Sequence, residues 1–107
     1  MPDRGVPANT IAATVADIAS ELDDVDIATV GDGFELRRGS QVFVVVDGSG
    51  AELRLRPDVA EAVLGTPDTA PSRRGSEWIR FEPEVIDPSV EDRLVAWVTS
   101  AWRAAGT

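Results

Sequence analysis

Residues 26–56 read DIATVGDGFELRRGSQVFVVVDGSGAELRLR, and this stretch decides the fold. It divides into four short segments separated by glycine-containing turns: Asp26–Val30, Phe34–Arg38, Gln41–Val46 and Ala51–Arg56. In two of these segments, apolar side chains alternate with charged ones at the period of a half-buried strand. Short turns that contain glycine typically join neighbouring antiparallel strands. The stretch therefore predicts a four-strand antiparallel meander.

A helix is predicted before the meander, from about Asn9 to Asp23. Its apolar residues recur at spacings of three and four, which places one stripe toward a core: Ile11, Val15, Ile18 and Leu22. Asn9 or Thr10 is the expected N-cap, because short polar side chains there can bond the free amides of the first turn.

Two further helices are predicted after the meander. Asp58 and Glu61 form a capping-box-like pair that opens a short helix, and Gly65 is placed to stop it. Asp87 and Pro88 begin the final helix, which Gly106 ends. Its broad apolar stripe consists of Val90, Leu94, Trp97, Val98, Ala101 and Trp102.

Between these helices, residues 66–76 carry two prolines and a glycine and are expected to form an irregular loop, followed by a last strand at Glu77–Phe81. The order is then α-β-β-β-β-α-β-α. We expect an α+β fold in which an antiparallel β-sheet of about five strands is packed by the N- and C-terminal helices. A single domain over 9–107, preceded by a flexible N-terminus at 1–8, accounts for the whole chain.

Four residue types are missing from the sequence: histidine, cysteine, tyrosine and, because all ten basic residues are arginine, lysine. These types supply most nucleophiles, near-neutral acids and bases, and soft metal ligands. Their absence predicts a non-enzymatic protein that needs no metal and no cofactor. The first ten residues lack the apolar region of a secretory signal, and no apolar run is long enough to span a bilayer, so a cytoplasmic location is expected.

The net charge of −9 is unevenly distributed. Residues 1–36 hold eight acids against Arg4 alone, and residues 81–107 hold five acids against two arginines. Only residues 37–80, with seven arginines and six acids, are close to balanced. An acidic chain needs a local cationic face to bind nucleic acid, and this middle third is where such a face would lie.

Most of the middle arginines, with one tryptophan, form the first candidate site, for an anion or nucleic acid: Arg37, Arg54, Arg56, Arg73, Arg74, Trp78 and Arg80. Guanidinium groups bind phosphates and carboxylates well, and an indole offers a surface on which a base can stack. The alternative is a solvated strand face on which these arginines pair with Glu35, Glu52 and Glu77.

Two tryptophans of the final helix are candidate contacts for a partner protein. Trp97 and Trp102 are five residues apart, so they point in directions about 140° apart and cannot both enter one narrow seam. One of them is then free to contact a partner, unless both cover the edge of the sheet in a monomer. The acidic groups, Asp23, Asp24 and Asp26 and then Glu82 and Glu84, lack the spacing of a calcium loop and are expected to be solvated.

The segment from Phe34 to Trp102 resembles the small bacterial MmcQ/YjbR family. The resemblance rests on the strand pair FELRRGSQVFVVVDG, the strand and helix start ELRLRPDVAEAVLG, the tryptophan-containing strand GSEWIRF and the terminal pair WR. It implies a CyaY-like fold with a double-wing shape associated with DNA binding. Many members carry histidine, lysine or tyrosine where this chain has Ser72–Ser76. A weaker resemblance, to the short luciferase-associated domain, rests on the same order of elements.

These observations favour a small binding module that recognises a partner protein or a small anionic ligand through the sheet face and the 66–76 segment. The alternative is a nucleic-acid-binding protein that uses the arginine set, and a carboxylate-dependent enzyme is the third hypothesis. We expect no membrane partner, and a monomer or a weak homodimer.

Overall fold

The computed structural model describes residues 10–106. In chain order, the elements are α1 (Ile11–Ser20), β1 (Asp26–Val30), β2 (Gly33–Arg38), β3 (Gln41–Val46), β4 (Ala51–Arg54), α2 (Pro57–Val63), β5 (Thr69–Pro71), β6 (Trp78–Phe81) and α3 (Pro88–Ala105). The α+β class is confirmed. The predicted flexible N-terminus at 1–8, and Asn9 as a possible cap, lie outside the described residues.

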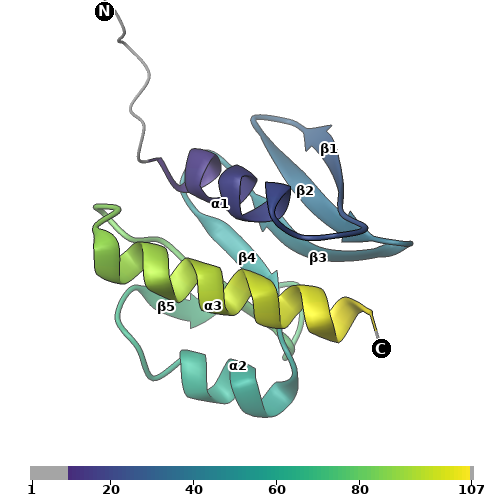
Figure 1. The fold of residues 1–107 in the computed structure, drawn as a ribbon. Helices are drawn as coiled ribbons and strands as arrows, with labels where there is room; N and C mark the ends of the chain where they lie inside the picture. Colours follow the sequence, from purple (N-terminus) through teal and green to yellow (C-terminus); the bar gives the residue numbers. More distant parts are fainter. Residues whose placement is uncertain (1–9, 107) are drawn as a thin grey trace, which may run out of the picture.

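The strands form one antiparallel sheet with the order β1-β2-β3-β4-β6-β5. Helices α1 and α3 lie side by side on one face of this sheet, and α2 lies beyond α3, near β5 (Figure 1). The long helix α3 runs across the middle strands. One face of the sheet is therefore covered by helices, and we call the other the open face.

The core lies between the sheet and the helices, and it is built from alternate residues of the strands. Leu36, Val44, Leu53 and Ile79 are neighbours across four successive strands, and all four are fully buried. The predicted stripe of α3 packs against them, with Leu94 and Val98 completely buried. Burial of this apolar surface is the main contribution to the stability of the fold.

The meander was predicted closely, and the helix caps less so. Strands β1 and β3 have the predicted bounds, and the caps at Thr10 and Asp87 are confirmed, since each side chain accepts a hydrogen bond from a first-turn amide. The capping box in α2 is wrong. That helix begins at Pro57, so Asp58 lies within its first turn, and the N-cap position is held by Arg56, which makes no capping bond.

The sheet has six strands where about five were expected. The additional strand is β5, which lies within the 66–76 segment that was predicted to be irregular, and it pairs with β6 from Thr69↔Phe81 to Pro71↔Ile79. Strand β4 is also shorter than predicted and ends at Arg54. The last predicted strand begins one residue later, at Trp78.

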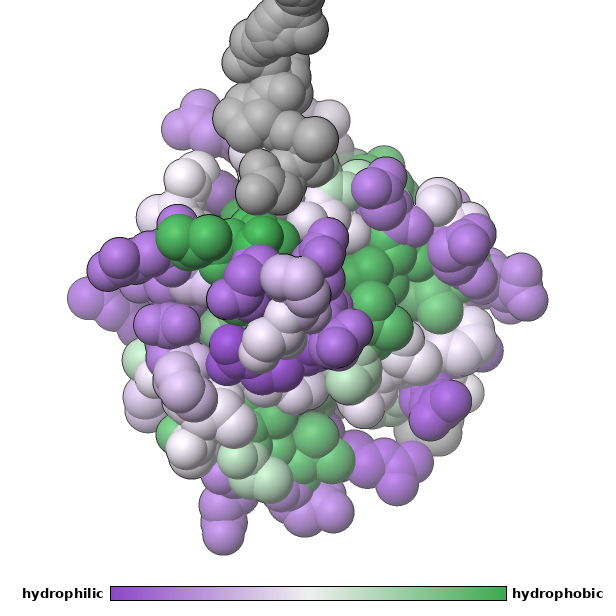
Figure 2. Space-filling model, turned by 60° about the vertical axis from the view of Figure 1, so that its left-hand side comes forward, coloured by the Kyte–Doolittle hydropathy of each residue, from purple (hydrophilic) through white to green (hydrophobic). Residues whose placement is uncertain are grey.

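The surface mixes apolar and polar side chains. On the face shown in Figure 2, the green apolar areas are separate from one another, and purple hydrophilic side chains lie between them. No helix among the described residues is long and apolar enough to cross a membrane.

Candidate functional site

The open face of the sheet carries most of the arginines singled out in the sequence. Residues of β4 and β6 alternate between the two faces, so Leu53 and Ile79 enter the core while Glu52 and Arg80, which are direct cross-strand neighbours, lie on the open face. Arg54 and Trp78 are the next pair on the same face.

Arg80 lies at the centre of a polar cluster on this face. Its Nη1 and Nη2 atoms donate to the two carboxylate oxygens of Asp47 at 2.9 and 3.0 Å, and its Nε donates to Glu82 at 2.6 Å. Nη2 also donates to the Ser49 hydroxyl at 2.7 Å. This is a bidentate guanidinium–carboxylate contact, which fixes both side chains in one orientation. We call the whole set the open-face cluster: Asp47, Ser49, Glu52, Ser72, Arg74, Arg80 and Glu82.

The 66–76 segment folds onto the same face through Glu52. The Ser72 hydroxyl donates to one oxygen of the Glu52 carboxylate at 2.5 Å, and the Arg74 Nε donates to the other at 2.8 Å. The Ser72 hydroxyl also accepts a hydrogen bond from the Arg74 amide. The Glu52 side chain is only 12% exposed, so the segment covers it. Two residues of the predicted loop are thus bonded to the sheet.

These contacts shift the protonation equilibria of the cluster. Hydrogen bonds from Arg80 hold the pKa of Asp47 well below its ordinary value of 3.8, although burial works in the other direction. Burial also favours the neutral form of Glu52, but hydrogen bonds from Ser72 and Arg74 outweigh it and lower the pKa. The bonds to Asp47 raise the pKa of Arg80. All three groups are therefore charged at neutral pH.

Three other candidate arginines, Arg37, Arg54 and Arg56, do not converge on this cluster. The Arg37 Nε donates to Glu35 on the same strand at 2.9 Å. Arg54 contacts Glu77 at 3.4 Å, and Arg56 lines the same small hollow beside the last turn of α3. The arrangement matches the alternative in which Glu35, Glu52 and Glu77 pair with the arginines of the strand face.

Two of the candidate arginines make no ion pair with any described residue, Arg56 and Arg73. Arg73 lines an open hollow of about 550 Å³, together with Pro71 and four side chains of the open-face cluster. Trp78 is half-buried nearby, and the Arg74 guanidinium lies 5.4 Å from the centre of its ring. The hollow thus presents the Arg73 guanidinium beside a cluster in which both arginines are paired with carboxylates.

Trp97 is a core residue. It is 8% exposed, and its ring meets Phe81 edge to face, with the ring centroids 4.9 Å apart. The Arg93 guanidinium lies over both rings.

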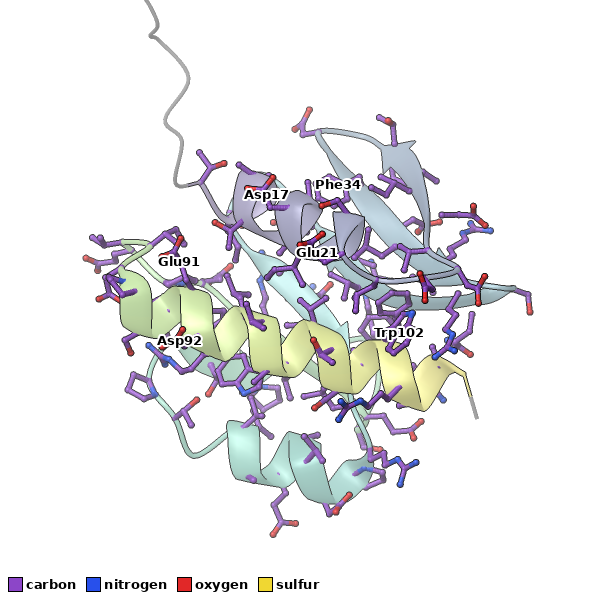
Figure 3. The ribbon with its side chains drawn as sticks, in the orientation of Figure 1. Asp17, Glu21, Phe34, Glu91, Asp92 and Trp102 are labelled. Atoms are coloured by element: carbon purple, nitrogen blue, oxygen red, sulfur yellow. The ribbon has the colours of Figure 1, made fainter. Side chains whose placement is uncertain are left out.

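Trp102 is half-buried and connects three parts of the chain. Its Nε1 donates to the carbonyl of Asp23 at 2.7 Å, and the Arg38 guanidinium lies 4.0 Å from its ring centre. Arg38 also donates to the Trp102 carbonyl. Figure 3 shows Trp102 near the C-terminal end of α3. The geometry gives both tryptophans intramolecular contacts.

Acidic residues on the helix face come from separate elements. Asp17 and Glu21 lie one turn apart on α1 and its C-cap, while Glu91 and Asp92 lie near the start of α3 (Figure 3). No group of three histidine, cysteine, aspartate or glutamate side chains within residues 10–106 is arranged to hold a metal ion.

Sequence reasoning assigned Asp47 and Ser49 to no site, and it expected Glu82 to be solvated without identifying its bond from Arg80. Asp47 and Ser49 belong to the Asp47–Gly50 turn, where Asp47 Oδ1 accepts from the amides of Ser49 and Gly50 at 2.9 Å. An aspartate at the first position of a glycine turn is a recognised signal for this arrangement. Its second role, as the partner of Arg80, depends on the position of β6.

Comparison of the chain with models of known protein families, with curated proteins and with solved structures finds no match.

Proposed function

We propose that this chain is a small non-enzymatic module that binds a partner protein through the open face of the sheet and the 66–76 segment. The observation that carries the proposal is the open-face cluster beside Arg73 and Trp78. Protein interfaces are enriched in arginine and tryptophan, and a rigid set of charges gives a partner a fixed pattern to recognise.

The pairing of the arginines favours a protein over an anion or a nucleic acid. Arg74 and Arg80 already donate to Glu52, Asp47 and Glu82, so a phosphate would have to displace bonded carboxylates. Nucleic-acid binding gains its affinity from unpaired cations that release counterions from phosphates. A partner protein can instead contact both signs of charge at once.

The chemistry of the cluster also favours binding over catalysis. A general acid or base works best with a pKa near the operating pH. The pKa values of Asp47 and Glu52 are both shifted away from neutrality, and the lowered pKa of Asp47 makes it a weaker base.

The test is a comparison of protein capture by the wild-type chain and by Arg73→Ala and Trp78→Ala variants, with Arg103→Ala on α3 as the control. We expect at least one protein that the wild-type chain captures to be lost with the Arg73→Ala and Trp78→Ala variants and retained with the Arg103→Ala control. The same protein should bind the purified wild-type chain in calorimetry. If every captured protein is held equally by all four chains, the proposal is wrong.

A second measurement addresses the nucleic-acid alternative. Fluorescence anisotropy with a labelled DNA duplex at low salt would detect an arginine-dependent site. Affinity that falls steeply with salt and disappears in the Arg73→Ala and Arg74→Ala variants would replace our proposal with DNA binding. The membership in the MmcQ/YjbR family stays a hypothesis, supported by the residues that suggested it.

A further inference from the structure

Strand β1 is an unpaired edge of the sheet. Within residues 10–106, it hydrogen-bonds to β2 on one side and to no strand on the other. It also carries two of the most exposed large apolar side chains, Ile27 at 54% and Val30 at 51%. An exposed apolar edge strand is a ready template for pairing with another chain.

The backbone geometry of β1 shows which groups are available. Val30 and Gly33 flank a two-residue turn, and Ala28 pairs with Glu35 two positions further along. In an antiparallel pair, alternate residues direct their N–H and C=O groups toward the partner strand. Because the residues beside such a turn bond to each other, Ile27 and Thr29 direct their backbone groups outward.

The two apolar side chains lie on opposite faces of this edge. Ile27 lies on the helix face, like its cross-strand neighbour Leu36. Val30 lies on the open face, because it is two residues from Ala28, whose cross-strand neighbour Glu35 is on that face. An added strand would therefore have an apolar contact on each face of the sheet.

The other edge of the sheet is protected. Strand β5 has only three residues and ends in Pro71, which has no amide to donate. Short length and proline are common ways to block an edge. The contrast makes β1 the edge that is open to an added strand.

The charge around β1 indicates the chemistry of the occupant. A hollow of about 760 Å³ lies at the start of the strand, between the α1–β1 connection and the last turn of α3. Its lining residues include Asp23, Asp24 and Asp26, with Arg38 as the one cation among them. The C-terminal end of α3 adds partial negative charge. Such surroundings attract an arginine or lysine side chain.

We propose that β1 accepts an extended basic peptide of a partner protein as a seventh strand. The backbone groups of Ile27 and Thr29 bond to it, its apolar residues contact Ile27 and Val30, and a basic side chain lies beside Asp26. A second copy of the chain fits this edge less well, because it would bring its own Asp24, Asp26 and Asp32 to an acidic edge in a molecule of net charge −9. This edge is distinct from the open-face cluster and the 66–76 segment used in the proposed function.

The probe is a labelled peptide of alternating valine and threonine with an arginine at each end, and the matched control has glutamate at each end. We expect fluorescence anisotropy to show binding of the arginine peptide, weakening with salt, and none of the glutamate peptide. Thr29→Pro removes an outward amide, and Thr29→Val keeps it, so only the first should weaken binding by about tenfold or more. Ile27→Lys, at an exposed site, is a second variant, which replaces an apolar side chain that the peptide is proposed to contact. Thermal unfolding checks that each variant folds.

Equal binding of both peptides, or no binding of either, would overturn the proposal. So would light scattering that shows a wild-type dimer converted to a monomer by Thr29→Pro, because that result would assign the edge to a second copy. If no peptide binds to β1 but the open-face cluster still captures its partner protein, the strand-addition proposal is wrong and the proposed function stands.

Discussion

The contact between Arg80 and Asp47 gives the sharpest prediction about the open-face cluster. The Arg80→Gln substitution removes two hydrogen bonds to Asp47 and one to Glu82, and it leaves the 12% exposed carboxylate of Glu52 with Arg74 as its nearest cation. Asp47→Asn is the complementary change, because an amide oxygen can still accept from the amides of the turn. Together these variants form a double-mutant cycle that isolates the pair.

The expected magnitude follows from the exposure of the two side chains. The Arg80 side chain is 21% exposed and that of Asp47 is 43% exposed, so solvent partly screens their attraction. We expect Arg80→Gln to lower the free energy of unfolding by about 2 kcal/mol, of which about 1 kcal/mol is coupling to Asp47. The single change is larger than the coupling because it also removes the bonds to Glu82 and Ser49.

The coupling should depend on pH in a definite direction. The pKa of Asp47 is lower in the folded chain than its ordinary value of 3.8, so the stabilisation is complete above that value and is lost as pH falls. Between pH 6 and pH 2.5 the coupling should decrease, because the unfolded chain takes up a proton on Asp47 in this range more readily than the folded chain does.

Urea unfolding followed by tryptophan fluorescence would measure these quantities at both pH values, since the chain has three tryptophans. Arg73→Gln is the matched control, because Arg73 makes no ion pair with a described residue, and it should change stability by less than about 0.5 kcal/mol. A coupling indistinguishable from zero at pH 6, or one that is equal at both pH values, would refute the reasoning.

Three other substitutions test separate parts of the fold. Trp102→Phe removes the indole donor to the Asp23 carbonyl and should cost about 1 kcal/mol, with faster hydrogen exchange in the α1–β1 connection. Asp87→Ala should cost about 1 kcal/mol in thermal unfolding through loss of the α3 cap, whereas Asp87→Ser should restore most of it. Gly33→Ala places a Cβ atom 1.8 Å from a carbonyl oxygen of β3 and should lower the free energy of unfolding by more than about 2 kcal/mol. Gly48→Ala is the control: its Cβ atom has no other atom within 4 Å, so this variant should unfold at nearly the wild-type urea concentration.

The meander could be predicted because its signals are local. Alternating side chains set the strand face, and the turns at Gly31, Gly39 and Asp47–Gly50 set the reversals. Both Gly31 and Gly39 have the positive φ angles that such turns require. These features need no knowledge of distant residues, so the bounds of β1 and β3 were obtained directly.

Strand β5 could not be predicted because its pairing is not local. Thr69–Pro71 is short, lacks alternation and contains a proline, so its sequence is typical of a loop. It is a strand because β6 offers it a free edge, and proline is acceptable at an outer position of that kind. The misplaced cap of α2 has a local cause instead, because Pro57 begins the helix earlier than the Asp58–Glu61 pattern suggests.

The kinds of residue in the open-face cluster could be predicted from the sequence, but their pairing could not. The sequence identified arginines and the glutamates that could neutralise them, because alternation places Glu35 with Arg37 and Glu52 with Arg54 on the same face of their strands. It could not identify Asp47 as the main partner of Arg80, since 33 residues separate them and only the pairing of β4 with β6 brings them together. The role of Trp102 was missed for the same reason, because its acceptor at Asp23 is 79 residues away.

The strand order separates the two proposed surfaces. Strand β1 forms one edge of the sheet, and the 66–76 segment contains the strand at the other edge, five strand intervals away. At about 4.8 Å for each interval, β1 and the strand within the 66–76 segment are roughly 24 Å apart along the sheet, well beyond the distance at which substitutions usually interact. The effects of Thr29→Pro and Arg73→Ala should therefore be independent: each should weaken its own interaction and leave the other unchanged. If one substitution impairs both interactions, a single partner spans the open face from edge to edge, and the two surfaces are parts of one interface.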